Sequence, residues 1–172
     1  MAETDQSDFA VLALPLLRPL FNFARWLSRD ADEAEDLVQE TYARALKGFS
    51  GFRPGTNFRA WMFQILRNTF LTSRTGKPVS VEIEEESEVF ADRRTPETVL
   101  MNATTRLQIQ HALERLPAEF REVILLCDVE EMRYREIADL LGIPQGTVMS
   151  RISRARRLLR GYLAEEKMRV GR

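Results

Sequence analysis

Five arginines lie between residues 151 and 160, and no acidic residue separates them. They are Arg151, Arg154, Arg156, Arg157 and Arg160. An arginine can hold guanine O6 and N7 with two hydrogen bonds, which discriminates that base from others by about 1–3 kcal/mol. It can also bind phosphate, which positions a protein on DNA without reading the sequence. The stretch therefore predicts nucleic-acid binding, and the alternative is a solvated basic face.

The elements that would position these arginines are a short helix, a tight turn and a second helix, together spanning residues 134–160. Counted from Tyr134, a small residue is fifth (Ala138), a glycine ninth (Gly142) and a β-branched residue fifteenth (Val148). The small residue lets two helices approach closely, and the glycine can adopt the left-handed backbone that ends a helix. This pattern predicts a helix-turn-helix, whose second helix enters the DNA major groove.

Helical spacing gives the second helix two faces. An apolar stripe of Val148, Ile152, Ala155 and Leu159 should face the domain core, and Gly146, Ser150, Ser153, Arg154 and Arg157 lie opposite. Because groove readout usually comes from the N-terminal half of such a helix, we expect the groove to be contacted by Gln145, Thr147, Ser150, Arg151 and Arg154. We expect phosphate contacts, which position but do not specify, from Arg135, Arg156, Arg157 and Arg160.

Residues 49–74 offer another kind of nucleic-acid chemistry. Bases that leave the stack are held by aromatic faces, by polar contacts to their edges and by arginines on phosphates. The segment supplies such groups at Phe49, Phe52, Arg53, Thr56, Asn57, Arg59, Trp61, Arg67, Asn68 and Arg74. Trp61 is ambiguous because it also fits the apolar stripe of a helix, so packing in the core is an alternative to stacking on DNA.

The net charge of −1 hides a strong segregation of charge. Acidic residues gather at 30–40 and again at 82–88. Asp36, Gln39 and Glu40 fall on the polar side of an expected helix, away from Leu37 and Val38. Such a face could bind a basic protein surface, or it could be a solvated face with acids placed favourably near a helix N-terminus.

Several classes of function find no support in the sequence. Cys127 is the single cysteine and His111 the single histidine, which excludes an internal disulfide and a zinc knuckle. There is no glycine-rich phosphate loop, no metal-ligand cluster and no recognisable nucleophile–base pair. We therefore expect no catalytic residues, no metal and no cofactor. No apolar run of about 18 residues and no signal-peptide pattern occurs, so we expect a cytoplasmic protein without membrane insertion.

The expected fold class is all-α, with two small helical domains joined by an acidic flexible linker. The expected bounds are 1–75, 76–94 and 95–172, with Thr95 and Pro96 starting the second domain. The helix from Asp32 to Lys47 should bury Leu37, Val38, Thr41, Tyr42, Ala45 and Leu46. A helix from Phe58 to about Arg74 should bury Phe58, Trp61, Met62, Ile65, Leu66 and Thr69. Further helices should end near Arg115 and run from Leu116 to about Val129.

Three segments, together with the helix-turn-helix, carry a resemblance to a known family. The segments are D-E-A-E-D-L-V-Q-E-T-Y-A-R-A-L at 32–46, F-R-P-G-T-N-F-R-A-W-M-F-Q-I-L-R-N at 52–68 and L-P-A-E-F-R-E-V-I-L-L at 116–126. In this combination the chain resembles the extracytoplasmic-function (ECF) sigma factors of bacterial RNA polymerase. The resemblance covers nearly the whole chain. It makes the first domain similar to sigma region 2 and the second similar to region 4.

The resemblance implies a promoter-specificity subunit with no catalytic residues of its own. Its partners would be core RNA polymerase, promoter DNA and an anti-sigma factor, which most members of this subgroup have. Asp36, Gln39 and Glu40 would dock on a basic coiled coil of the polymerase. The loop from Phe52 to Asn57 would capture a flipped base of the −10 element, with Asn68 contacting its upstream part. The helix-turn-helix would read the −35 element.

Two other functions remain open at this point. A sigma-like decoy would sequester an anti-sigma factor without binding DNA, but it would not need a basic recognition helix. A helix-turn-helix repressor would bind duplex DNA alone, usually as a dimer on a palindrome, and the acidic helix and near-neutral charge disfavour that class.

Overall fold

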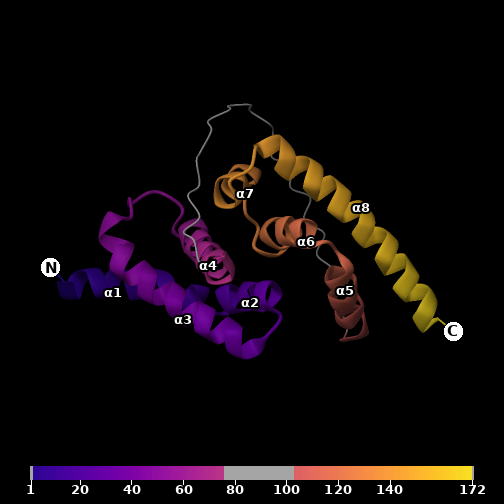
Figure 1. The fold of residues 1–172 in the computed structure, drawn as a ribbon, viewed down its shortest axis with the longest axis horizontal. Helices are drawn as coiled ribbons and strands as arrows, with labels where there is room; N and C mark the ends of the chain where they lie inside the picture. The colour runs from indigo at the N-terminus through magenta and orange to yellow at the C-terminus, as the bar shows by residue number, and fades with distance from the viewer. Residues whose placement is uncertain (1, 76–102, 172) are drawn as a thin grey trace. The chain divides into compact units, whose positions relative to one another are not determined.

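The structure is a computed structural model that describes residues 2–75 and 103–171, and it contains helices and no strand in these ranges (Figure 1). The chain divides into two compact units, Met1–Glu82 and Ile83–Arg172. The first unit comprises α1 (Ala2–Ala13), η1 (Leu14–Leu16), α2 (Leu17–Ser28), α3 (Ala31–Gly48), η2 (Phe49–Gly51) and α4 (Phe58–Thr75). The second comprises α5 (Ala103–Arg115), α6 (Ala118–Ile124), η3 (Leu125–Val129), α7 (Tyr134–Leu141) and α8 (Gln145–Val170).

Local signals set the helix boundaries of the first unit. Pro15 lies in the short 3₁₀ turn η1, which separates α1 from α2. Arg29 ends α2 with a left-handed backbone at φ 60°. Asp30 then caps α3, because its carboxylate accepts a hydrogen bond from the Glu33 backbone N–H at 2.8 Å. The loop expected after α3 contains the 3₁₀ turn η2, and the Asn57 side chain caps α4 through the Ala60 N–H at 3.1 Å.

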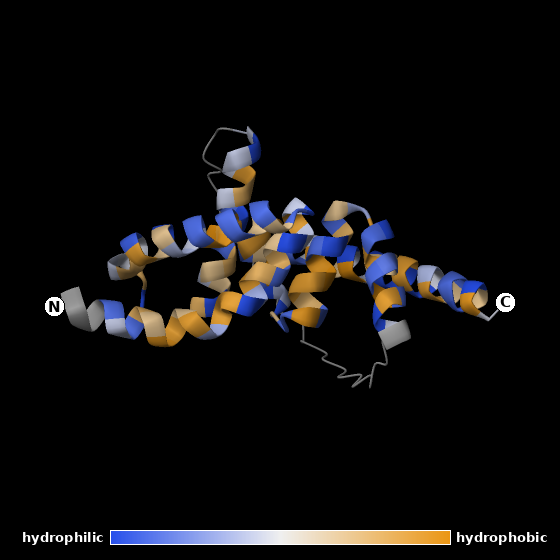
Figure 2. Ribbon diagram, turned by 90° about the horizontal axis from the view of Figure 1, so that it is seen from below, coloured by the Kyte–Doolittle hydropathy of each residue, from blue (hydrophilic) through white to orange (hydrophobic). Residues whose placement is uncertain are grey.

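The core of the first unit lies between α2, α3 and α4. The rings of Phe23 and Phe63 meet at a centroid distance of 5.3 Å, and both side chains are fully buried. Figure 2 shows hydrophobic and hydrophilic residues alternating around the helices. The expected inner face of α3 was wrong at Leu46, which is 42% exposed. The buried side of α3 ends at Ala45, and one further residue rotates the chain by about 100° toward solvent.

The second unit contains the expected helix-turn-helix, formed by α7 and the start of α8. Gly142 adopts the left-handed backbone at φ 66° and ends α7, while Ala138 and Val148 are buried between the two helices. The helix expected from Leu116 to Val129 is instead α6 followed by the π-helical turn η3. Helix α8 packs against α5, α6 and α7 and continues ten residues beyond the expected end at residue 160.

Two arginines fix the end of α5 in the second unit. Arg121 is buried and donates hydrogen bonds to the backbone carbonyls of Leu113, Glu114 and Leu116 at 2.8–3.0 Å. It thereby satisfies carbonyls that a helix C-terminus leaves without intrahelical partners. Arg115 ties α5 to the last turns of α8, where it lies 4.0 Å from the centroid of the Tyr162 ring and 2.7 Å from the carboxylate of Glu165.

The expected acidic linker at 76–94, its cluster of glutamates and the helix start at Thr95 and Pro96 lie outside the described residues. Within residues 2–75 and 103–171, no helix has both the length and the apolar character needed to cross a membrane.

Candidate nucleic-acid interface

The acidic face of α3 presents the three predicted docking residues together. Asp36, Gln39 and Glu40 are all exposed, and Leu37 and Val38 between them are buried. The Glu40 carboxylate pairs with Arg44 one turn later at 2.6 Å. An exposed pair of this spacing contributes only about 0.3–0.5 kcal/mol, so Glu40 can exchange Arg44 for a cation of a partner at little cost.

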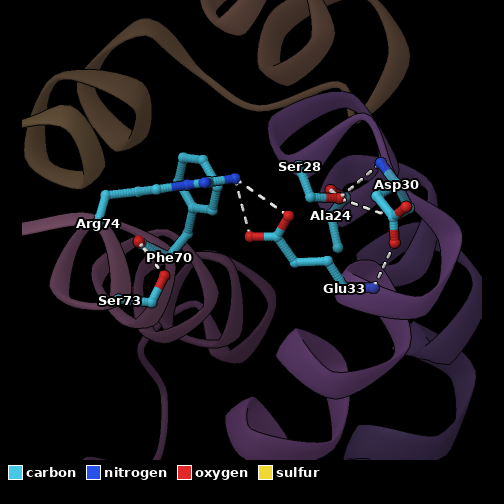
Figure 3. Close-up of polar contacts among 7 residues, drawn as sticks. All are labelled: Ala24, Ser28, Asp30, Glu33, Phe70, Ser73 and Arg74. Carbon is cyan, nitrogen blue, oxygen red and sulfur yellow. Dashed lines mark hydrogen bonds and ion pairs between the residues drawn. The ribbon is translucent and has the colours of Figure 1, made fainter.

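Glu33 belongs to the acidic residues at 30–40, but its carboxylate binds another residue of the first unit. Figure 3 shows Arg74 from the end of α4 lying across the ring of Phe70 and reaching Glu33 at the start of α3. The guanidinium is 2.8 Å and 3.0 Å from the two Glu33 carboxylate oxygens and 5.1 Å from the Phe70 ring centroid. Arg74, which the sequence offered for phosphate binding, therefore joins α4 to α3 in this structure.

A groove that the sequence reasoning missed adjoins the acidic face. It has a volume of roughly 590 Å³, and its lining is mostly apolar. Its lining residues are Leu14, Pro15, Leu17, Arg18, Phe21, Glu35, Val38 and Gln39. Leu14 and Leu17 are more than half exposed. A helical apolar pattern alone does not distinguish such exposed residues from core residues, so the groove has no separate signal in the sequence.

The ring of Phe52 lies inside an aromatic cluster rather than at the loop tip. It is 5.1 Å from the Trp61 ring and 5.3 Å from the Phe58 ring, centroid to centroid, and it stacks on Phe49 at 6.1 Å with an interplanar angle of 8°. Phe52 and Trp61 are both half-buried. Trp61 packs on the rings of Phe52 and Phe58 where the loop joins α4, and part of its own ring remains accessible to solvent.

The tip of the same loop carries the predicted polar groups. Arg53, Thr56 and Asn57 are exposed. The Thr56 hydroxyl donates to the Arg53 carbonyl at 2.7 Å, and Gly55 between them has φ +88°. This positive φ favours glycine. The loop is therefore shaped by its own hydrogen bonds and backbone, with a guanidinium, a hydroxyl and an amide on its outer side.

Asn68 lies apart from the loop. It lies eleven positions after Asn57, which corresponds to about 16 Å along the axis of α4. Asn68 is half-buried, and its Oδ1 atom is shielded from solvent without a hydrogen-bond partner in the described part of the chain. The structure thus places Asn68 along α4, about three helical turns from the 52–57 loop.

The residues predicted to lie on the outward face of α8 are exposed in the structure. Ser150, Arg154 and Arg157 are exposed, Gln145 and Thr147 are half-buried at the helix start, and Arg135 on α7 is exposed. On the inner side Val148, Ile152 and Ala155 are buried, whereas Leu159 is only half-buried.

Two arginines of the basic stretch have partners inside the unit. Arg156 binds Asp128 at 2.6 Å, and this hydrogen bond, more than any other interaction, raises the pKa of its guanidinium above the usual value. Arg151 has a 28% exposed side chain that lies 3.5 Å from Glu119. The expectation that Arg156 contacts phosphate therefore competes with a bidentate ion pair, which sequence spacing could not reveal because 28 residues separate the partners.

The described residues contain no group of histidine, cysteine, aspartate or glutamate side chains that could hold a metal ion. The chemical groups that the two units present are aromatic, amide, hydroxyl and guanidinium groups on one hand and exposed carboxylates on the other. Such groups bind nucleic acids and proteins.

Comparisons with known proteins identify the family of each unit. The family model for Sigma-70 region 2 matches residues 12–77, and that for Sigma-70, region 4 matches residues 106–159. The ECF RNA polymerase sigma factor EcfG of Rhodopseudomonas palustris is 36% identical over 159 residues, which cover 91% of this chain and 83% of that protein. The ECF RNA polymerase sigma factor SigE of Mycolicibacterium smegmatis is 39% identical over 150 residues, covering 85% of this chain, which spans 58% of the relative's length.

Solved structures give the same result. The sigma factor RpoE from Bartonella quintana, in complex with the anti-sigma factor NepR, matches with a TM-score of 0.68 and 33% identity over 91% of this chain and 97% of that chain. CnrH, in complex with the cytosolic domain of CnrY, matches with a TM-score of 0.67 and 27% identity over 95% and 92% of the two chains.

A region 2 unit followed by a region 4 helix-turn-helix unit defines a sigma factor, which is a transcription initiation factor and not an enzyme. The all-α fold and the order of the two units are as the sequence predicted. The chain belongs to the ECF sigma factors of RNA polymerase.

Proposed function

We propose that this chain binds core RNA polymerase through α3, reads and opens the −10 element through the 52–57 loop and α4, and reads the −35 element through α8. The observation that carries the proposal is the exposed polar and basic face at the start of α8, held by a complete helix-turn-helix. A protein that only sequestered an anti-sigma factor would have no use for that face.

The polymerase contact is assigned to the acidic face of α3, defined by Asp36, Gln39 and Glu40. Three exposed polar residues on one helical face suit a basic partner surface. The groove beside Gln39 adds apolar surface to the same side of the unit. Charges at the rim of an interface steer association and select the partner more than they add affinity, so the two features have complementary roles.

The −10 contact is assigned to two places on the first unit. Phe52, Arg53, Thr56, Asn57 and Trp61 form the loop and its aromatic base, which would hold one base outside the stack. Asn68 would contact the upstream part of the element.

The −35 contact is assigned to the first turns of α8 and to Arg135 on α7. Arg154 is the strongest candidate for guanine because it is exposed and no described acid binds it. Gln145, Thr147, Ser150 and Arg151 would contact the groove beside it, while Arg135 and Arg157 would bind phosphates, which position the helix without specifying sequence.

We also propose regulation by an anti-sigma factor, because two solved relatives were captured with such partners or with a partner's cytosolic domain. The proposed domain bounds are 1–75 and 95–172 with an acidic linker at 76–94. Because the polymerase works in the cytoplasm, this is also the location that we propose.

The test is in vitro transcription with core polymerase and a library of genomic promoters from the source organism. We expect run-off transcripts from a subset of promoters that share two short elements, and their loss with Arg154→Ala. Lys167→Ala, a change near the far end of α8, serves as the matched control and should leave the transcripts unchanged. A chain that binds core polymerase but yields no transcript from any promoter would refute the proposal in favour of a decoy.

A further inference from the structure

Aromatic rings hold the 52–57 loop at both of its ends. Phe58 and Trp61, in the first turn of α4, contact Phe52 from the side where the loop ends. Phe49, in the turn η2 before the loop, contacts Phe52 from the side where the loop begins. The loop therefore closes on a small aromatic platform instead of hanging freely between α3 and α4.

Phe49 has a special place in this platform. Its ring lies flat against that of Phe52, at 6.1 Å with an interplanar angle of 8°, while its edge contacts join it to Phe58 at 6.1 Å and to Phe9 at 5.3 Å. Phe9 is buried and belongs to α1, and its ring also meets Tyr42 of α3 at 6.4 Å. Through Phe49, the loop base is thus packed directly against side chains of α1 and α4.

We propose that Phe49 is a positioning residue for the base-capture loop: it fixes the ring of Phe52, and through it the loop, in the geometry that discriminates among bases. This inference rests on the proposed capture of a −10 base. Phe49 offers no hydrogen-bonding side-chain group and is half-buried, so it would act through Phe52 without touching DNA.

The rest of the loop agrees with a preformed site. The hydrogen bond from Thr56 to the Arg53 carbonyl, the positive φ of Gly55 and the cap made by Asn57 all define one loop conformation. A loop that is already ordered loses less conformational entropy when it binds, which favours a well-fitted ligand. Loosening the platform should therefore reduce selectivity more than general affinity for single-stranded DNA.

The test uses holoenzyme assembled from this chain and core polymerase. A randomised pool of single-stranded oligonucleotides identifies the preferred base, and two oligonucleotides that differ only at that base then give a ratio of affinities. We expect Phe49→Met to lower this ratio by about 2- to 12-fold, which corresponds to the range of one aromatic pair. Phe49→Tyr, which keeps the ring, should restore the ratio.

Phe70→Met is the matched control, because Phe70 lies on α4 under Arg74 and outside the platform. It should leave the ratio unchanged. Affinity for core polymerase should be similar in all variants. Phe49→Met loses several ring contacts, so its urea midpoint of tryptophan fluorescence should fall, but the variant should remain folded at the assay temperature. If Phe49→Met unfolds below the assay temperature, Phe49→Leu takes its place.

An unchanged ratio in Phe49→Met, or an equal loss of affinity for both oligonucleotides, would overturn the inference and leave the proposed function standing. A wild-type holoenzyme that shows no base preference at any position would instead refute base capture itself, and the inference with it.

Discussion

Arg121 should be essential for the stability of the second unit. In Arg121→Met the unbranched apolar stem is retained, but all the guanidinium donors are lost. Three backbone carbonyls, at the end of α5 and just after it, would each lose a hydrogen bond that is now 2.8–3.0 Å long, and the Leu113 carbonyl would keep only a 3.2 Å bond from the Leu116 N–H. A buried acceptor left without a partner costs about 1–3 kcal/mol, and two of these bonds are buried and one is part-buried. We therefore expect a loss of about 3–5 kcal/mol.

That loss is large compared with the stability of the unit. About 70 residues at roughly 0.05–0.15 kcal/mol each give about 3–10 kcal/mol in total. With a urea dependence of about 1 kcal/mol per M, the midpoint should fall by roughly 3–5 M. The second unit of Arg121→Met should therefore be partly or wholly unfolded without denaturant, and −35 recognition should be lost with it.

The two units can be followed separately in one sample. Both tryptophans, Trp26 and Trp61, belong to the first unit, so tryptophan fluorescence follows that unit alone. Far-ultraviolet circular dichroism follows the helices of both. We expect Arg121→Met to lose helical signal at low urea while the fluorescence midpoint stays that of the wild type. Arg135→Met, a change of an exposed arginine in the same unit, is the control. A dichroism midpoint that differs from wild type by no more than about 0.5 M would refute the reasoning, because at about 1 kcal/mol per M this shift corresponds to about 0.5 kcal/mol, the range of ordinary surface substitutions.

Three further changes test other surfaces. Arg154→Ala should lower discrimination between a cognate −35 duplex and one with a substituted guanine by about 1–3 kcal/mol in competition binding; equal weakening on all sequences would make Arg154 a phosphate contact instead. Glu40→Lys should reduce affinity for core polymerase, most strongly at low salt, with an unchanged circular dichroism spectrum, and unaltered affinity would remove Glu40 from the docking face. Asp30→Ala removes the cap of α3 and should cost about 1 kcal/mol, which lowers the urea midpoint of tryptophan fluorescence. Asp32→Ala, a change of an acid two residues later that makes no cap bond, should lower this midpoint less.

The helix-turn-helix could be predicted because its constraints are local. Gly142 must take a left-handed backbone, Ala138 must be small and Val148 must fill a gap, and each requirement restricts the residue type at one position. The capping of α3 by Asp30 and of α4 by Asn57 is local in the same sense. Family resemblance supplied the roles of the surfaces, which spacing alone did not contain.

The features that could not be predicted depend on contacts between distant segments. Arg156 looked free in the sequence, but folding brings Asp128 within 2.6 Å of it. Arg121 binds backbone carbonyls, which are present at every residue and so leave no signal in the side chains. Leu46 follows the helical pattern to its last position, yet it is exposed while the adjacent Ala45 is buried, and which of the two neighbours is covered depends on how the other helices pack. Phe49 is one phenylalanine among several, and only the orientation of its ring distinguishes it.

The length of α8 has a mechanical consequence. Its 26 residues form a rod of about 39 Å, whereas the major groove is about 12 Å wide. Only the first turns of α8 can lie within the major groove, and the far half of the helix extends away from the DNA as a lever. Because Arg115 of α5 contacts Tyr162 and Glu165 in the far half of α8, any tilt that a promoter imposes on the near end of α8 is transmitted to α5, the first described helix of the second unit.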